Sequence, residues 1–327
     1  MRFLVRRVGF LLVALWAALT VNFFIPRLMP GNPAQAMMAQ FRGHVNPIAL
    51  HALEVAFGVN THQSLLSAYV DYVSNTFHGN FGISTSYFPL PVSSVIMRAL
   101  PWSIGLVGLS TVLGFIIGTA IGAISAWRRG GLLDSALPPV FIIISAFPYF
   151  WVGLLSIWFF ALTLNWFPLL GGYSETATPA WTWSFVGDVL IHAVLPAFTI
   201  LITSIGGWIL TMRNNMITVV AEDYVKMARA KGLKTRRILW HYAGRNALLP
   251  NLTGFAMSLG FVISGAILVE YVFNYPGLGF MLLQAVQSED YPLMQSLFLL
   301  ITVAVLFAIF LSDVATAILD PRTRSST

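Results

Sequence analysis

Long apolar segments with almost no charged residues constrain this chain more strongly than any other feature. A helix needs about 20 consecutive apolar residues to cross the hydrocarbon core of a bilayer. Only 9% of the residues are charged, too few to cover the water-facing surface of a soluble protein of this length. We therefore predict an all-α integral membrane protein with six transmembrane helices, at about 9–25, 100–126, 135–164, 192–212, 252–273 and 296–319.

The positions of the basic residues predict how these helices are oriented. If the N-terminus is cytoplasmic, fifteen of the eighteen lysines and arginines lie in four cytoplasmic segments, and only Arg27, Arg42 and Arg98 lie outside. Such an excess is typical of cytoplasmic loops, so both termini are expected in the cytoplasm. The net charge of +6 then reflects orientation in the membrane. Because the basic residues are scattered over four segments and form no known module, no nucleic acid is expected as a partner.

The N-terminal third contains the first span and an extramembrane region. The apolar run 9–25 follows a basic start, so a signal peptide is the alternative. The run is somewhat long for one and no small-residue cleavage site precedes Pro26, which favours an uncleaved span. The chain is thus divided into an N-terminal segment with the first span, a small extracytoplasmic domain of short helices, a core of five further spans and a cytoplasmic tail: 1–29, 30–98, 99–319 and 320–327.

A row of glycines in the second span predicts a close helix contact. Gly114, Gly118 and Gly122 recur every fourth residue and leave bare backbone along one face of the helix. Small residues let helices approach each other in lipid, where no hydrophobic effect drives them together. We interpret the row as a helix-packing face.

Prolines and polar residues mark the candidates for lining a passage. A proline inside a membrane helix frees backbone carbonyls that protein or a water-filled cavity must satisfy. Ser145, Phe147 and Pro148 are therefore candidates, with a packed kink as the alternative, and Ser264 and Glu270 in the fifth span are two more. The spans hold almost no ionisable group, so Glu270 is expected to be an interfacial or packing residue and not a proton relay.

A basic, soluble-looking segment, 221–250, separates the fourth and fifth spans and holds seven of the eighteen basic residues. Glu222 and Asp223 open a short helical stretch that ends in basic residues, an order that suits the helix dipole. Gly232 follows where the end of the helix needs a residue that accepts a positive φ. A second helix is expected from Thr235, with these residues on one side: Ile238, Leu239, Tyr242 and Ala243. This arrangement predicts a docking element for a cytoplasmic protein.

Motifs for catalysis or for nucleotide binding are missing from the sequence. It has no G-x-x-x-x-G-K-[ST] phosphate loop, no H-E-x-x-H, no cysteine and no convincing Ser-His-Asp order. We therefore expect neither an enzyme nor a cofactor or metal site in this chain. Transport against a gradient would need an energy source on another protein.

Several motifs resemble one family of membrane proteins. Gly232 and the later Leu249-Pro250 pair match a cytoplasmic coupling loop known as the EAA motif, although Lys226 and Met227 stand where Glu and Ala are usual. Further matches lie at 30–33 (P-G-N-P), 79–84 (G-N-F-G-I-S), 269–279 (V-E-Y-V-F-N-Y-P-G-L-G) and 319–324 (L-D-P-R-T-R). With these motifs the chain resembles the permease subunit of ABC importers, in the branch that carries oligopeptides, dipeptides, nickel and some oligosaccharides.

The resemblance implies a fold, a set of partners and a site. The fold would be the type I ABC importer permease, in a bacterial or archaeal cell membrane. The partners would be a second related permease subunit, two ATPase subunits that hold ATP and Mg²⁺, and an extracytoplasmic solute-binding protein. The coupling loop at 214–250 would dock on an ATPase subunit through Glu222, Asp223, Tyr224, Lys226, Ala228, Arg229, Gly232, Leu249 and Pro250.

Within that loop the resemblance suggests separate roles. Tyr224, Ala228 and Gly232 would seat the short helix in a groove of the ATPase. Lys226 and Arg229 would pair with acidic groups there, and a solvated, lipid-facing positive patch is the alternative.

Other functions remain open at this point. Peptides are the default cargo of the family branch, but a tryptophan-rich outer loop at 165–188 makes oligosaccharides such as β-linked glucosides an alternative. An ion-driven secondary carrier would transport without ATP. An intramembrane enzyme would need buried polar catalytic groups, and the spans show none.

Overall fold

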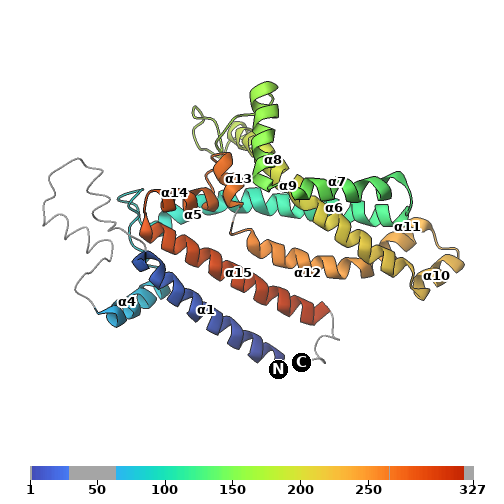
Figure 1. Cartoon of the computed structure of the whole chain (residues 1–327), viewed down its shortest axis with the longest axis horizontal. Helices are drawn as coiled ribbons and strands as arrows, with labels where there is room; N and C mark the ends of the chain where they lie inside the picture. Colours follow the sequence, from blue (N-terminus) through green and yellow to red (C-terminus); the bar gives the residue numbers. More distant parts are fainter. Residues whose placement is uncertain (1, 29–63, 265, 320–327) are drawn as a thin grey trace.

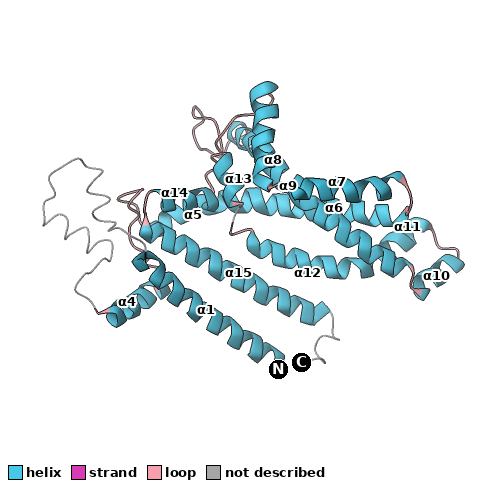
Figure 2. Ribbon diagram, in the orientation of Figure 1, coloured by secondary structure: helices cyan, strands magenta, loops and turns pink. Residues whose placement is uncertain are grey.

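The computed structural model describes residues 2–28, 64–264 and 266–319, and within these ranges the chain is helical without a strand (Figure 2). One isolated antiparallel bridge joins Ile83 to Pro91. Most of the expected extracytoplasmic domain lies outside the described residues; the part that is described contains α4 (Leu65–Phe77). The motif at 30–33 and the tail at 320–327 also lie outside them.

Among the described residues, four helices are long and apolar enough to cross a membrane: Arg6–Ile25, Val92–Trp127, Trp183–Val220 and Tyr291–Val314. They belong to α1 (Arg2–Leu28), to the continuous helix α5–η1–α6, to α9 (Trp183–Val220) and to α15 (Tyr291–Leu319). A bent pair formed by α7 (Leu132–Ala146) with α8 (Tyr149–Ser156) and η2 (Ile157–Thr163) would be a fifth span if it crosses as one unit. The chain is therefore a multi-span helical membrane protein.

The fifth expected span, 252–273, is not one helix. The helix that follows the basic segment begins much earlier, with α11 (Thr235–Arg237), and continues through η3 (Ile238–Gly244) into α12 (Arg245–Phe261). After a break, α13 (Ile267–Val272) and α14 (Leu278–Gln287) form two short helices before α15. Residues 273–277 separate these two helices. Gly277, the last of them, has an extended backbone (φ −92°, ψ −179°) and directly precedes α14.

The second span is longer than expected and contains a local distortion. α5 (Val92–Ser103) includes Pro101, and the π-helical η1 (Ile104–Gly108) follows it directly before α6 (Leu109–Trp127). A proline removes one backbone hydrogen bond of an α-helix, and a π-helical turn is one way to restore the pairing of the freed carbonyls. The span therefore continues without a break.

The glycine row of α6 lies against α9. A Cβ atom at Gly118 would come within 2.6 Å of the Trp208 Cβ, and one at Gly122 would overlap the carbonyl oxygen of Ile209. The two helices therefore meet backbone to backbone, which only glycine permits at this distance.

The third span breaks at Phe147, where α7 and α8 meet at an angle of 93°. Phe147 has an extended backbone (φ −84°, ψ 137°), the conformation that a following proline favours. Figure 1 shows α8 projecting away from the other long helices. The sequence predicted an interruption here, and the structure shows a full change of direction.

Three clusters of buried side chains hold the helices together. We name them by the side that the predicted orientation gives them. The outer cluster joins α5, α14 and α15, the middle cluster joins η1, η2, α9 and α13, and the cytoplasmic cluster joins α6, α9, α10 (Asp223–Ala230), η3 and α12. In Figure 1 the end of α6, the start of α7, α10 and α11 lie together at the right-hand end of the molecule.

Helix α1 packs along α15 with opposite direction (Figure 1). Near one end Asn22 and Gln295 exchange hydrogen bonds, because each side-chain amide donates to the backbone carbonyl of the other residue at 2.9 Å. Near the other end Arg7 forms an ion pair of 2.7 Å with Asp313. These polar contacts fix the register of the two helices.

Candidate coupling surface and buried carboxylates

The short helix α10 ends as its sequence predicts. It covers Asp223–Ala230, with Glu222 before its first turn and Arg229 in its last turn. Gly232 follows with φ +71°, a conformation that L-amino acids with a side chain adopt at a cost. The N–H of Gly232 donates to the Arg229 carbonyl at 2.9 Å. The chain then turns into the helix that starts at Thr235.

One side of α10 is packed into the chain itself. Val225 and Ala228 are buried in the cytoplasmic cluster, together with Met212 and Met216 of α9. The predicted side of the following helix meets them there: Ile238, Leu239 and Ala243 are buried and Tyr242 packs against the cluster. Burying apolar side chains in this way contributes roughly 1.5–3 kcal/mol for each large one. Consequently α10 is fixed to the ends of α6, α9 and α12.

Ala228 does not face a partner. We expected its side chain to seat the helix in a groove of another protein, but it is only 3% exposed and points into the cytoplasmic cluster. Its small size lets α10 approach the spans closely. The side of α10 that is open to a partner is instead formed by Tyr224 and Met227, which are 39% and 59% exposed. Met227 was not predicted, and its place between exposed basic residues on a short amphipathic helix is the signal that could have indicated it.

The charged residues of α10 contact their own chain. Lys226 forms an exposed ion pair of 2.9 Å with Asp223, three residues earlier, and this hydrogen bond and charge lower the pKa of Asp223. The Tyr224 hydroxyl accepts a hydrogen bond of 2.7 Å from the Asn246 amide. Glu222 is exposed and makes no side-chain cap for the helix. Acidic and basic groups are therefore both presented at this surface.

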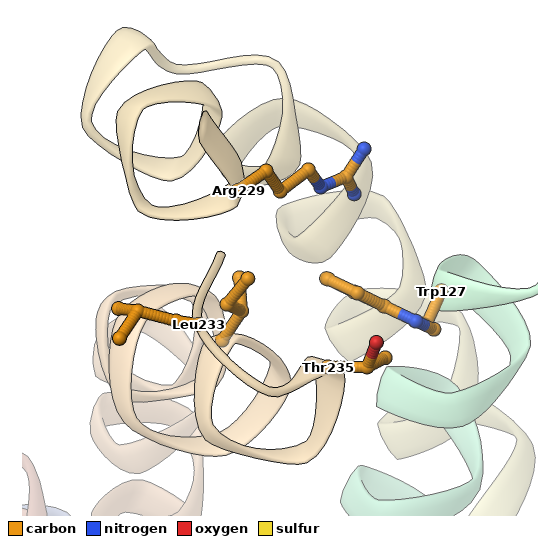
Figure 3. Close-up of a pocket in the computed structure, with 5 residues that line it drawn as sticks. Trp127, Arg229, Leu233 and Thr235 are labelled. Atoms are coloured by element: carbon orange, nitrogen blue, oxygen red, sulfur yellow. The ribbon is translucent and has the colours of Figure 1, made fainter. Parts of the chain in front are cut away.

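Arg229 borders an open hollow of about 450 Å³ between α10, the end of α6 and the following helix. Figure 3 shows its guanidinium on the same side of the hollow as Trp127, and its central carbon lies 4.8 Å from the centre of a Trp127 ring. A cation in this position is attracted by the aromatic face. Leu233, Thr235 and Ile238 complete the lining. Of these residues, only Arg229 was predicted as part of the site.

The end of the predicted loop is helical. Leu249 and Pro250 lie in the second turn of α12, and both are exposed. They therefore extend the accessible surface from α10 along the start of the next span.

The passage candidates are dispersed over several elements. Phe147 is 52% exposed at the break between α7 and α8, and Pro148 directly precedes α8. The Ser264 hydroxyl donates to the carbonyl of Phe261 at 2.5 Å, just past the end of α12. The side chain of Ser145 lies outside the described part of the structure. The geometry of this single chain leaves their role in a passage a prediction.

Glu270 is enclosed by its own chain and does not line an open passage. Its side chain is fully buried. One carboxylate oxygen accepts from the Ser103 hydroxyl at 2.7 Å, and the other accepts from the backbone N–H groups of Gly279 and Phe280 at 2.7 and 3.3 Å. Ser103 also accepts from the N–H of Leu278 at 2.8 Å. The first N–H groups of α14 are thus satisfied by side chains, as a helix N-terminus requires.

A second buried carboxylate, Asp290, has a similar role. It accepts hydrogen bonds from the Ser84 hydroxyl, from the N–H of Ser86 at 3.0 Å and from the N–H of Leu293 at 3.2 Å. The bond to Leu293 caps the start of α15. Because Ser84 and Ser86 precede α5, Asp290 joins two segments about 200 residues apart in the sequence. The motif at 79–84, which ends at Ser84, was noted in the sequence, but this contact was not predicted.

Comparisons with known proteins give a consistent result. A family model described as "Binding-protein-dependent transport system inner membrane component" matches residues 118–325. The chain is 31% identical to a dipeptide transport system permease protein of Lactococcus lactis subsp. cremoris, with 99% of both chains covered. It is 32% identical to a di/tripeptide transport system permease protein of Pseudomonas aeruginosa and 31% identical to an oligopeptide transport system permease protein of Bacillus subtilis, with 98% of both chains covered in each case.

Proposed function

Because this chain belongs to the family of binding-protein-dependent transport system inner membrane components, we propose that it forms half of the membrane passage of an ATP-driven peptide importer. Similarity to permeases of dipeptide and oligopeptide transport systems along nearly the whole chain supports peptides as the cargo. In this proposal ATP and Mg²⁺ bind to separate ATPase subunits, which agrees with a sequence that has no phosphate loop. The remaining partners are a second permease subunit and an extracytoplasmic solute-binding protein.

The proposed topology has six spans with both termini in the cytoplasm. The bent α7–α8–η2 unit and the helix 245–261 with its break are the third and fifth crossings. Two observations support this topology: Lys and Arg are concentrated in four segments, and the contacts of Arg7 with Asp313 and of Arg229 with Trp127 bring the ends of helices from those segments together. To test this topology, a single cysteine is introduced by Lys231→Cys or Trp181→Cys and labelled from either side of the membrane. Position 231 is expected to react from the inside and position 181 from the outside.

Helix α10 is the proposed contact with the ATPase. The proposed mechanism rests on one observation: α10 has one accessible face and one face packed against the spans. Tyr224, Met227 and the rim of the Arg229 hollow are accessible, whereas Val225 and Ala228 attach the helix to the ends of the spans. A push on the open face is therefore passed to α6, α9 and α12 and changes which side of the membrane the passage faces.

Reconstitution tests the class of transporter. The purified complex in lipid vesicles, with its ATPase subunits and its binding protein, is expected to take up a labelled dipeptide only when ATP is present on the cytoplasmic side. A catalytically inactive ATPase subunit is the matched control and should abolish uptake. Uptake driven by a proton or sodium gradient without ATPase subunits would identify a secondary carrier instead.

The cargo needs its own test, because one observation keeps oligosaccharides in consideration. Trp181 and Trp183, next to the start of α9, are almost completely exposed, with fractions of 102% and 92%. Exposed tryptophans suit the headgroup region of a membrane and also stack on sugar rings. Calorimetric titration of the partner binding protein with di- and tripeptides and with β-linked oligosaccharides should give binding only with peptides. Binding of oligosaccharides alone would overturn the peptide assignment.

A further inference from the structure

A buried ion pair connects the proposed ATPase contact to the bent third span. Asp134 lies in the first turn of α7 and Arg213 lies on α9, seven residues before its end. Arg213 Nε donates to Asp134 Oδ1 at 2.6 Å, and the side chains are 21% and 7% exposed. We propose that Asp134 and Arg213 form a positioning pair that makes α7 follow α9 when the ATPase moves α10. This inference rests on the proposed function.

The carboxylate of Asp134 joins three elements at one point. Besides Arg213, it accepts a hydrogen bond of 2.9 Å from the N–H of Gly130, in the turn between α6 and α7. The hydroxyl of Ser125, on α6, lies 3.5 Å from Asp134 Oδ1. The end of α6, the turn and α9 are therefore all attached to the start of α7.

The α9 side of the pair belongs to the same packed unit as α10. Met212, the neighbour of Arg213, is buried in the cytoplasmic cluster with Val225 and Ala228 of α10. At Gly122 the backbone of α6 touches α9, and a Cβ there would lie 3.1 Å from the backbone nitrogen of Arg213. Displacement of α10 must therefore displace the part of α9 that carries Arg213.

The other contacts that connect α7 to α6 and α9 fix its position less strictly than the ion pair does. The covalent turn contains Gly130 with φ +80° and Gly131, and glycines leave a turn easy to deform. An apolar contact also exists, since a Cβ at Gly206 would come within 2.9 Å of the Phe141 Cβ. Apolar contacts are non-directional, whereas a hydrogen-bonded ion pair fixes both distance and orientation. The ion pair is thus the element that holds the register of α7 on α9.

The test measures movement at both ends of this connection. The chain has no cysteine, so spin labels can be placed at Lys231 beside α10, at the exposed Ile143 on α7 and at Leu311 on α15 as a reference. In the reconstituted importer, ATP and loaded binding protein should change the 231–311 and 143–311 distances. In Asp134→Asn, the 231–311 change should persist, and the 143–311 change should be largely lost.

Transport provides the second measurement. A coupling of 1–3 kcal/mol corresponds to a factor of roughly 5–150, so Asp134→Asn should move at least about fivefold fewer peptides per ATP hydrolysed. Ser135→Ala is the matched control, because this exposed neighbour only donates to the carbonyl of Gly131. It should leave both distance changes and the peptide-to-ATP ratio as in the parent. A purely structural role would lower the amount of complex without changing that ratio.

Variants at the other partner keep the inference testable if Asp134→Asn does not accumulate. Arg213→Gln should behave as Asp134→Asn, and Arg213→Lys, which keeps a charge that reaches the carboxylate, should retain most of the coupling. Persistence of the 143–311 change in Asp134→Asn or Arg213→Gln would overturn the inference and leave the proposed function intact. No response of the 231–311 distance in the parent would overturn the proposed function itself, and this inference with it.

Discussion

Two regions of the helical bundle use their carboxylates in opposite ways: the junctions from α13 to α15, predicted to lie at the outer end, and α10, predicted to lie at the cytoplasmic end. At the outer end, Glu270 and Asp290 are fully buried, and every hydrogen bond described for them is donated by this chain. At the cytoplasmic end, the side chain of Asp223 is 96% exposed and its ion-pair partner Lys226 is also open to solvent. Glu222 is exposed as well.

The buried carboxylates and the exposed carboxylates therefore have different roles, one in the stability of the fold and the other in contact with a partner protein. A buried carboxylate that accepts several hydrogen bonds holds helices in place, because its loss leaves unsatisfied donors in a medium of low polarity. An exposed charge pair contributes little to folding and remains available to a partner protein. Substitutions at the outer end should therefore lower stability, and substitutions at the cytoplasmic end should lower transport.

The largest effect is expected for Glu270→Ala. The substitution removes the acceptor for the N–H groups of Gly279 and Phe280 and for the Ser103 hydroxyl. Several unsatisfied buried donors should cost on the order of 3 kcal/mol or more. Thermal unfolding of the purified complex measures the loss, and Glu175→Ala, at an exposed outer loop, is the control. An unchanged melting temperature would show that Glu270 is not the anchor of α14.

Asp290→Ala should have a smaller but clear effect. It removes the cap of α15 and the contact with Ser84 and Ser86, and a lost cap costs about 1–2 kcal/mol. Asp290→Asn keeps one oxygen acceptor and should recover part of the loss in melting temperature. Equal destabilisation by Asn and Ala would mean that the negative charge, and not the cap, is what matters at this position.

Gly232→Val tests the cytoplasmic end through the backbone. Nothing lies within 4 Å of a Cβ at this position, so the Cβ itself meets no neighbour, and the positive φ costs about 1–2 kcal/mol. We expect normal amounts in the membrane but reduced ATP-dependent uptake, because the orientation of α10 changes. Gly232→Asn is the control, since asparagine tolerates this conformation. Wild-type uptake by the Val variant would contradict a role for the end of α10 in coupling.

The smallest effect on stability is expected for Lys226→Ala. The lowered pKa of Asp223 means that the pair stabilises the fold above pH 3.8, the usual pKa, and that this contribution is lost as the pH falls through the lowered value. Because both groups are exposed and screened by salt, the melting temperature should not change measurably at pH 7. Binding of the ATPase subunits, measured at low salt, is the property that should weaken. A clear loss of stability in Lys226→Ala would contradict the view that the exposed charges of α10 contribute little to folding.

Local physical preferences made part of this protein predictable from its sequence. Apolar length identified the membrane-spanning character of α1, α6, α9 and α15, since crossing a bilayer requires a minimum length whatever the fold. Gly232 was identified because only the local backbone decides where a positive φ is needed. The spacing of Ile238, Leu239 and Ala243 identified the buried side of the second helix, because helical periodicity is a local property.

Contacts between distant segments could not be predicted in the same way. Glu270 was predicted as an interfacial or packing residue and as a candidate for lining a passage, and its enclosure depends on Ser103, 167 residues earlier in the chain. Ala228 was assigned to a partner from the resemblance to the coupling motif, and only the packing of α10 on α6 and α9 shows that it faces inward. The sequence by itself thus determined the membrane class and the glycine stop after α10, and the orientation expected from its charges stays a prediction. The tertiary structure decided which carboxylates are consumed by internal hydrogen bonds and which remain accessible, because burial depends on segments that the sequence alone does not place side by side.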